Sequence, residues 1–445
     1  MPSLRPQGID RHATMCMCIA WRDWRYPTVA NADSLTRALV QLDAWLETMR
    51  QPGGYGGPVA HWWHDQFLYT GPGLDWRYEG ILIGYSELWK KTGNRQWLQR
   101  VQQATEDLKL GQTAAGSFAM SGFERNPETL GTPHEAAASL GLLQSMQVTG
   151  DRTALPTARR NLAHLVQKLW DPVARGFNDR PGTPGRVPNK LATLSQALCV
   201  LAQLTNDNQW LDWAKAAIDD VVRFQIPQGP FQGAIHQYAP DNQHGDGRLF
   251  PFYNARCVEP LVVASHVFND PRYLAAAHEV LKFLRYTMTS DGQWPQICYL
   301  SGQSAAYPRW IAGSAEILYA FHTLGEPLPT GPLDQLLTSQ LPSGGFPTAI
   351  GFARKTRRRA PLDPPDYRDV TPVTGWNDKV LRLLSALLPP SADVWPEPAI
   401  TTYSREVLMH RKPIIFTETF DHFYYGDHLS MRKAEPWAKG GLIWG

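Results

Sequence analysis

Residues 280–294, VLKFLRYTMTSDGQW, contain the pattern that decides the fold. Val280, Leu281, Phe283 and Leu284 recur with the spacing of one apolar face of an α-helix. A glycine follows this run, and a tryptophan stands two positions after the glycine. The segment therefore predicts an amphipathic helix that ends in a glycine turn.

The same turn, a glycine with an aromatic residue one or two positions later, recurs along the chain. Its copies are Gly54-Tyr55, Gly116-Ser117-Phe118, Gly176-Phe177, Gly229-Pro230-Phe231, Gly292-Gln293-Trp294 and Gly345-Phe346. They are separated by roughly 50 to 65 residues, which is about the length of two helices with their connections. This periodicity predicts six helical hairpins.

A second helix is expected after each turn, and polar residues cluster at its start. The six starts are Asp75-Trp76-Arg77-Tyr78-Glu79, Pro133-His134-Glu135, Pro188-Asn189-Lys190, Tyr253-Asn254-Ala255-Arg256, Tyr307-Pro308-Arg309-Trp310 and Trp376-Asn377-Asp378-Lys379. Small and apolar residues follow, as in residues 136–143 and 191–204. Such helices are typical of an inner ring that is packed on all sides.

In these repeats the chain resembles the (α/α)6 toroids, which include six-hairpin glycosidases, epimerases, polysaccharide lyases and the squalene cyclases. The turns at residues 290–294 and 340–346 are similar to the Gln and Trp turn repeats of the cyclases. The resemblance implies an all-α toroid over residues 35–390, with inner helices that run parallel and begin at one rim. Residues 1–34 are expected to form an N-terminal extension, and residues 391–445 a C-terminal extension that packs on the toroid.

Composition excludes several classes of protein. The 445 residues are 43% hydrophobic and 19% charged, which argues against disorder. A formal net charge of +2 provides no long-range field for nucleic acid or anionic lipid. No apolar run has the length of a membrane span, and the five cysteines contain no CxxC pair. We therefore expect a cytoplasmic protein without a transmembrane segment.

The rim formed by the helix starts is the expected binding site. Helix N-termini favour anionic groups, and basic residues at five of the starts add positive charge. The predicted substrate-binding residues are Arg77, Glu79, Asn189, Lys190, Asn254, Arg256, Arg309, Trp310, Asn377 and Lys379, with His236 and Arg248 from the loop before the fourth start. The alternative interpretation is that each residue caps a helix or forms an ion pair with a neighbouring loop.

Five residues are candidates for catalysis. His134 opens a helix after Pro133, where an imidazole can act as acid or base near neutral pH, although it can equally be a capping or core histidine. Tyr253 is the second candidate proton carrier. Glu135, Glu259 and Asp378 are the candidate catalytic carboxylic acids.

Three further segments carry titratable or aromatic residues. His61, Trp62, Trp63, His64 and Asp65 suit either stacking on sugar rings or packing at the rim. His236, His244 and Asp246 share a loop, but their spacing matches no metal-ligand pattern. We therefore expect neither a metal nor another cofactor. Residues 410–425 lie outside the repeats and carry no readable function.

Four functions remain open. The first is an epimerase or lyase that abstracts the proton beside the carboxylate of an acidic, uronate-type sugar. The second is a glycoside hydrolase with paired carboxylic residues. The third is a terpene cyclase, although the chain has no DxDD or DDxxD motif. The fourth is a non-catalytic scaffold that binds a glycan.

Overall fold

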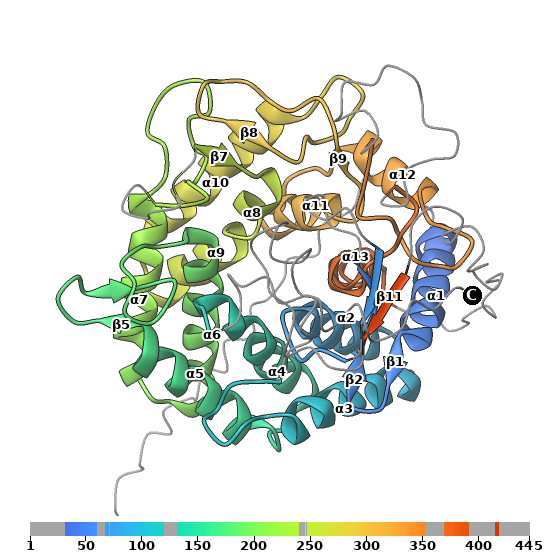
Figure 1. The fold of residues 1–445 in the computed structure, drawn as a ribbon, viewed down its shortest axis with the longest axis horizontal. Helices are drawn as coiled ribbons and strands as arrows, with labels where there is room; N and C mark the ends of the chain where they lie inside the picture. The colour runs from blue at the N-terminus through green and yellow to red at the C-terminus, as the bar shows by residue number, and fades with distance from the viewer. Residues whose placement is uncertain are drawn as a thin grey trace, which may run out of the picture.

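The computed structural model describes residues 32–59, 67–70, 72–119, 131–239, 245, 247–351, 369–390 and 414–417. Its helices form two concentric rings (Figure 1). The outer helices are α1 (Ala32–Thr48), α3 (Arg95–Leu110), α5 (Leu155–Leu169), α7 (Gln209–Arg223), α10 (Pro271–Thr287) and α12 (Thr330–Thr338). The inner helices are α2 (Arg77–Thr92), α4 (Ala136–Thr149), α6 (Pro188–Thr205), α9 (Val258–Val267), α11 (Ser314–Thr323) and α13 (Thr374–Leu387). Outer and inner helices alternate along the chain, which confirms the toroid of six hairpins.

The two rings differ in burial, as the apolar patterns predict. Helix α5 buries one face, including Leu162 and Leu165, and exposes Arg159 and Arg160. Helix α6 is buried on every side from Pro188 to Ala202. The ring closes where α13 packs on α2 and where α1 packs on α12. The core of the molecule therefore lies between the rings and inside the inner one.

The glycine turns connect each outer helix to the inner helix that follows it. The aromatic residues of all six turns are buried: Tyr55, Phe118, Phe177, Phe231, Trp294 and Phe346. Two of the turns are antiparallel pairs of short strands, β1 (Arg50–Gln51) with β2 (Gly54–Tyr55) and β5 (Trp170–Asp171) with β6 (Gly176–Phe177). Gly54 has a φ of +142°, and a Cβ there would collide with the Tyr78 hydroxyl. The turn therefore requires glycine at this position.

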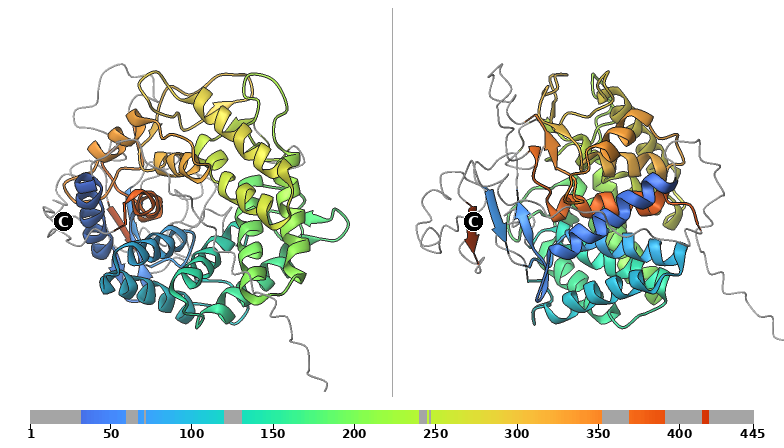
Figure 2. Two further views of the ribbon diagram at one scale, coloured as in Figure 1. Left: turned by 180° about the vertical axis from the view of Figure 1, so that it is seen from behind. Right: turned by 90° about the vertical axis from the view of Figure 1, so that its right-hand side faces the viewer.

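The other strands are also short. Strands β3 (Gly57–Val59), β4 (Phe67–Thr70) and β11 (Ile414–Thr417) form a three-stranded sheet in which β11 is parallel to β4. Antiparallel pairs join β7 (Arg248–Leu249) to β8 (Cys298–Tyr299) and β9 (Arg309–Trp310) to β10 (Ala349–Ile350). Strands β3, β4 and β11 project from one face of the toroid (Figure 2). The predicted division at residues 34 and 390 stays a prediction.

Three helix starts differ from their prediction. The helix expected at Tyr307–Trp310 is wrong, because Arg309 and Trp310 form strand β9 and α11 begins at Ser314. Their backbone groups pair with β10 and with Pro295, so they are not available to a helix. The fourth start is split into α8 (Pro251–Ala255) and α9. The second begins as the 3-10 helix η1 (Pro133–Glu135) before α4.

None of the helices in the described ranges is long and apolar enough to cross a bilayer.

Candidate functional site

Two of the predicted binding residues are asparagines that tie an inner helix to the loop before it. Asn377 Oδ1 accepts from the Phe346 amide at 2.7 Å, and its Nδ2 donates to the carbonyls of Phe346 and Val373, each at 2.9 Å. Asn254 repeats this arrangement on Ile235, with Oδ1 accepting at 2.5 Å and Nδ2 donating to Ile235 O at 3.2 Å. These side chains replace backbone partners that an irregular turn does not supply.

Arg77 and Glu135 have the same relation to their own turns. Arg77 Nη1 donates to Tyr55 O at 2.7 Å, and its guanidinium also pairs with Asp75 at 2.8 Å. Glu135 accepts from the amides of Phe118 and Gly131, each at 3.1 Å. Burial raises the pKa of Glu135. Both side chains are buried and stabilise the turns at the first and second hairpins.

A cluster of ion pairs occupies the middle of the inner ring, and Glu79 is its central residue. The Glu79 carboxylate binds Arg256 Nη2 at 2.8 Å, Lys379 Nζ at 2.9 Å and Arg382 Nη1 at 3.3 Å. All four side chains are at most 4% exposed. Burial raises the pKa of Glu79, but the three cations outweigh it and hold that pKa well below its usual range. Glu79 is therefore ionised.

Three more carboxyl groups complete this central cluster. Glu259 binds Arg382, and Glu316 lies 3.5 Å from Arg256 Nη1. Asp378 Oδ2 accepts from Gly80 N at 3.1 Å and from Lys379 Nζ at 2.9 Å. Four carboxyl groups thus face three cations. Burial, against the opposing effect of Lys379, raises the pKa of Asp378 to about 7, so this carboxyl group is only partly ionised in neutral solution.

The other predicted cations also have partners. Lys190 Nζ binds Asp179 at 2.8 Å, and Arg309 binds Asp291. The Arg248 guanidinium lies 5.8 Å from the centroid of the Phe250 ring. The positive charge expected at the rim is therefore largely balanced by carboxylates.

Aromatic rings from four hairpins lie next to the central cluster. Trp376 contacts Phe252, Trp310 and Trp76 at ring-centroid distances of 4.7, 5.1 and 5.4 Å. Lys379 Nζ lies 5.5 Å from the centroid of the Trp76 ring. Phe252, Trp310 and Trp376 are buried, whereas Trp76 is half-buried. The predicted binding residue Trp310 is therefore enclosed in this aromatic layer.

Several cations act on His134, one of the two predicted proton carriers. Its Nδ1 is buried without a hydrogen-bond partner in the part of the chain that the structure describes. Burial lowers its pKa first, and Arg256, Lys190 and Lys379 lower it further against the opposing effect of Glu79. The imidazole is therefore uncharged at neutral pH. The His134 side chain as a whole is half-buried.

Asn189, Tyr253 and His236 are the remaining predicted residues. Asn189 lies in the first turn of α6, and η1 packs on this helix. The Asn189 Oδ1 atom is buried and has no hydrogen-bond partner among the described residues. The half-buried Tyr253 ring packs on Phe250 at 5.1 Å and on Phe252 at 5.5 Å. His236 is half-buried, and burial lowers its pKa.

Arg382, Glu316 and Trp76 belong to the site but were absent from the predicted set. Arg382 stands one helical turn after Asp378 and Lys379, a spacing that would have placed it on the same face of α13. Glu316 was missed because α11 begins at Ser314, beyond the expected start at Tyr307–Trp310. Trp76 lies within one of the predicted starts but was not among the predicted binding residues.

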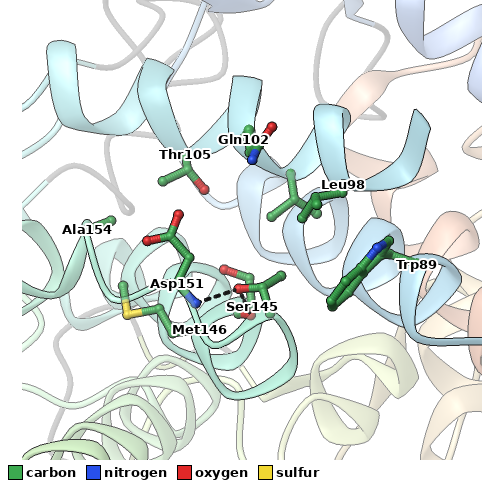
Figure 3. Close-up of a pocket in the computed structure, with 10 residues that line it drawn as sticks. Trp89, Leu98, Gln102, Thr105, Ser145, Met146, Asp151 and Ala154 are labelled. Carbon is green, nitrogen blue, oxygen red and sulfur yellow. Dashed lines mark hydrogen bonds between the residues drawn. The ribbon is translucent and has the colours of Figure 1, made fainter. Parts of the chain in front are cut away.

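Some predicted segments lie outside the described residues, namely residues 61–65, His244, Asp246, residues 410–413 and residues 418–425. No group of three or more possible metal ligands occurs in the ranges that the structure describes. A cavity of about 150 Å³ lies between α2, α3 and α4. Trp89, Leu98 and Ser145 are among its lining residues (Figure 3). It lies near the C-terminal ends of α2 and α4, away from the predicted rim.

Comparison with solved structures identifies the same toroid in several sugar-processing proteins. An unsaturated glucuronyl hydrolase specific for heparin superposes with a TM-score of 0.58 at 14% identity, covering 80% of this chain and 96% of its own. The cellobiose 2-epimerase of Spirochaeta thermophila superposes with a TM-score of 0.55 at 17% identity, and the match covers 80% of this chain and 97% of the epimerase. A family 76 glycoside hydrolase, a mannosidase of Bacteroides thetaiotaomicron, superposes with a TM-score of 0.55 at 11% identity, and the match covers 80% of this chain and 98% of the mannosidase.

The chain has the (α/α)6 toroid fold. At these identities the likeness shows the fold, and the chemistry has to be argued from the residues. No protein-family model matches the sequence, and no curated protein matches it.

Proposed function

We propose that the chain is a carbohydrate-active enzyme, an epimerase or lyase, that removes a proton from an acidic saccharide with His134 as the proton acceptor. One observation carries the proposal. The His134 imidazole is uncharged, and its Nδ1 has no hydrogen-bond partner among the residues that the structure describes. An uncharged imidazole with an available nitrogen has the protonation state that a general base requires.

The charges around His134 also suit this reaction. Arg256, Lys190 and Lys379 oppose protonation of the imidazole, and Glu79 favours it. The electrostatic potential at the ring is therefore positive, although each cation is paired elsewhere. A positive potential stabilises a carboxylate bound beside the ring and the enolate that forms when the neighbouring carbon loses its proton.

The structural neighbours support a sugar as the substrate. They include a glucuronyl hydrolase, a cellobiose epimerase and a mannosidase. Hydrolysis is less well supported in this chain, because Glu79, Glu135 and Asp378 are buried and engaged in internal contacts. Glu259 is 18% exposed but is bound to Arg382.

The test is incubation in deuterated water with uronate-containing oligosaccharides and with neutral reducing disaccharides. Deuterium at the carbon beside the carboxylate or carbonyl, or a new ultraviolet-absorbing product, is expected by NMR and absorbance. His134→Gln should lower this rate about 100-fold or more, which is the usual contribution of a general base. His266→Gln, an exposed histidine on α9, is the matched control and should retain the rate.

Two results would contradict the proposal. One is deuterium incorporation at the wild-type rate by a folded His134→Gln variant. The other is cleavage of a glycosidic bond without deuterium in the product, which would favour hydrolysis. Binding of an oligosaccharide without any conversion would favour the non-catalytic scaffold.

A further inference from the structure

Trp76 contacts both His134 and the central ion cluster. Its ring centroid lies 6.2 Å from that of His134, and the two planes are inclined at 41°. Lys379 Nζ lies 5.5 Å from the same indole. The edge-on ring of Trp376, at 5.4 Å, supports the indole from a third direction. The Trp76 ring thus lies next to both the imidazole and one cation of the central cluster.

Lys379 is held in place on the cluster side of this contact. Its Nζ binds Glu79 Oε2 and Asp378 Oδ2, each at 2.9 Å, and its side chain is 1% exposed. Glu79 is in turn bound by Arg256 and Arg382. A buried network with this many contacts has little freedom to move, so its charges stay at a constant distance from the indole.

We propose that Trp76 is a positioning residue for His134, whose indole orients the imidazole and keeps water out of the space between it and the charges of the central cluster. The role of His134 in turnover rests on the proposed function, whereas the effect of the indole on the imidazole rests on these contacts alone. With less water between the imidazole and the central cluster, the charges of the cluster act more strongly on the imidazole, because water screens electrostatic interactions.

The charged groups that act on His134 come from several elements around it. They are Glu79 on α2, Lys190 on α6, Lys379 on α13, and Arg256 between α8 and α9. Burial and the three cations hold the pKa of His134 well below its ordinary value. Loss of the indole admits water, which weakens both effects, so the pKa of His134 should move up toward 6.5.

The experiment is NMR titration of the full-length protein labelled at histidine, with the His134 signal assigned from its absence in His134→Gln. Trp76→Leu should raise the midpoint of the His134 titration by about one pH unit, a tenfold increase in proton affinity. Trp76→Phe, which keeps a ring, should raise it by less. The control is Trp213→Leu, a half-buried tryptophan on the outer helix α7, which should leave it unchanged.

An unchanged His134 midpoint in folded Trp76→Leu overturns the inference. If that variant does not fold, Trp76→Phe decides, and an unchanged midpoint there overturns it equally. Once a substrate is known, the acid limb of the kcat profile should move with the NMR midpoint. If the wild-type protein converts no saccharide, the proposed function fails, but the NMR titration still decides the role of Trp76.

Discussion

Two stretches of the rim look alike in sequence and differ in what their polar atoms do. At the starts of the fourth and sixth inner helices, Asn254 and Asn377 use both side-chain polar atoms to bond the preceding loop. At the starts of the second and third, His134 Nδ1 and Asn189 Oδ1 are buried without partners in the described part of the chain. Polar residues at a helix start therefore stabilise the fold where the preceding loop uses their hydrogen-bonding groups. A ligand can use only those that retain bonding capacity.

The largest effect is expected at Glu79, the centre of the buried cluster. Glu79→Gln leaves Arg256, Lys379 and Arg382 without their common carboxylate, so the free energy of unfolding should fall by about 3–5 kcal/mol. Glu87→Gln, on the same helix but 25% exposed, should change it by less than about 1 kcal/mol. Denaturant unfolding measures both. Equal losses would mean that the central cluster contributes no more than a surface pair.

Substitution of the asparagines tests the comparison directly. Asn377→Ala removes three buried hydrogen bonds and leaves the Phe346 amide without its acceptor, so we expect a loss of about 2–4 kcal/mol. Asn189→Ala should cost less than about 1 kcal/mol, because its buried oxygen bonds none of the described residues. Thermal unfolding of the two variants side by side gives the answer. A larger loss for Asn189→Ala would reverse the distinction between the two stretches.

Asp378 should make stability depend on pH. Burial raises its folded-state pKa to about 7, above the unfolded value of 3.8. Between these values the folded protein binds one more proton than the unfolded chain, so stability should fall as pH rises from 4 to 7 by about 1 kcal/mol per unit. Asp378→Asn should remove this slope, while the exposed Asp334→Asn should preserve it. An identical slope in Asp378→Asn would show that another group carries the proton.

The smallest effect is expected at Arg309, which pairs with Asp291 near the surface. The Asp291 side chain is 55% exposed, so solvent screens the pair. Arg309→Gln should therefore change the unfolding free energy by less than about 1 kcal/mol. A loss of several kcal/mol would place this arginine with the buried cluster instead of with the surface pairs.

The fold could be predicted because its determinants are local. Each hairpin carries its own apolar helix face and its own glycine turn with a buried aromatic residue, as at Gly176-Phe177. These features depend on residues within one or two helical turns of each other. The prediction of a helix start at Tyr307–Trp310 was wrong for the opposite reason. Whether those residues form a strand depends on β10, which lies about 40 residues later in the chain.

The chemistry of the rim required the tertiary structure. The sequence by itself identified Glu79, Arg256 and Lys379 as polar residues at three helix starts. Their contacts span 177 and 300 residues of sequence and exist only when the ring closes. Closure also brings Lys190, Lys379 and Arg256 around His134 and partly buries its ring, which decides the charge of the imidazole. Burial and distance determine the strength of an electrostatic interaction, and neither can be read from the spacing of residues along the chain.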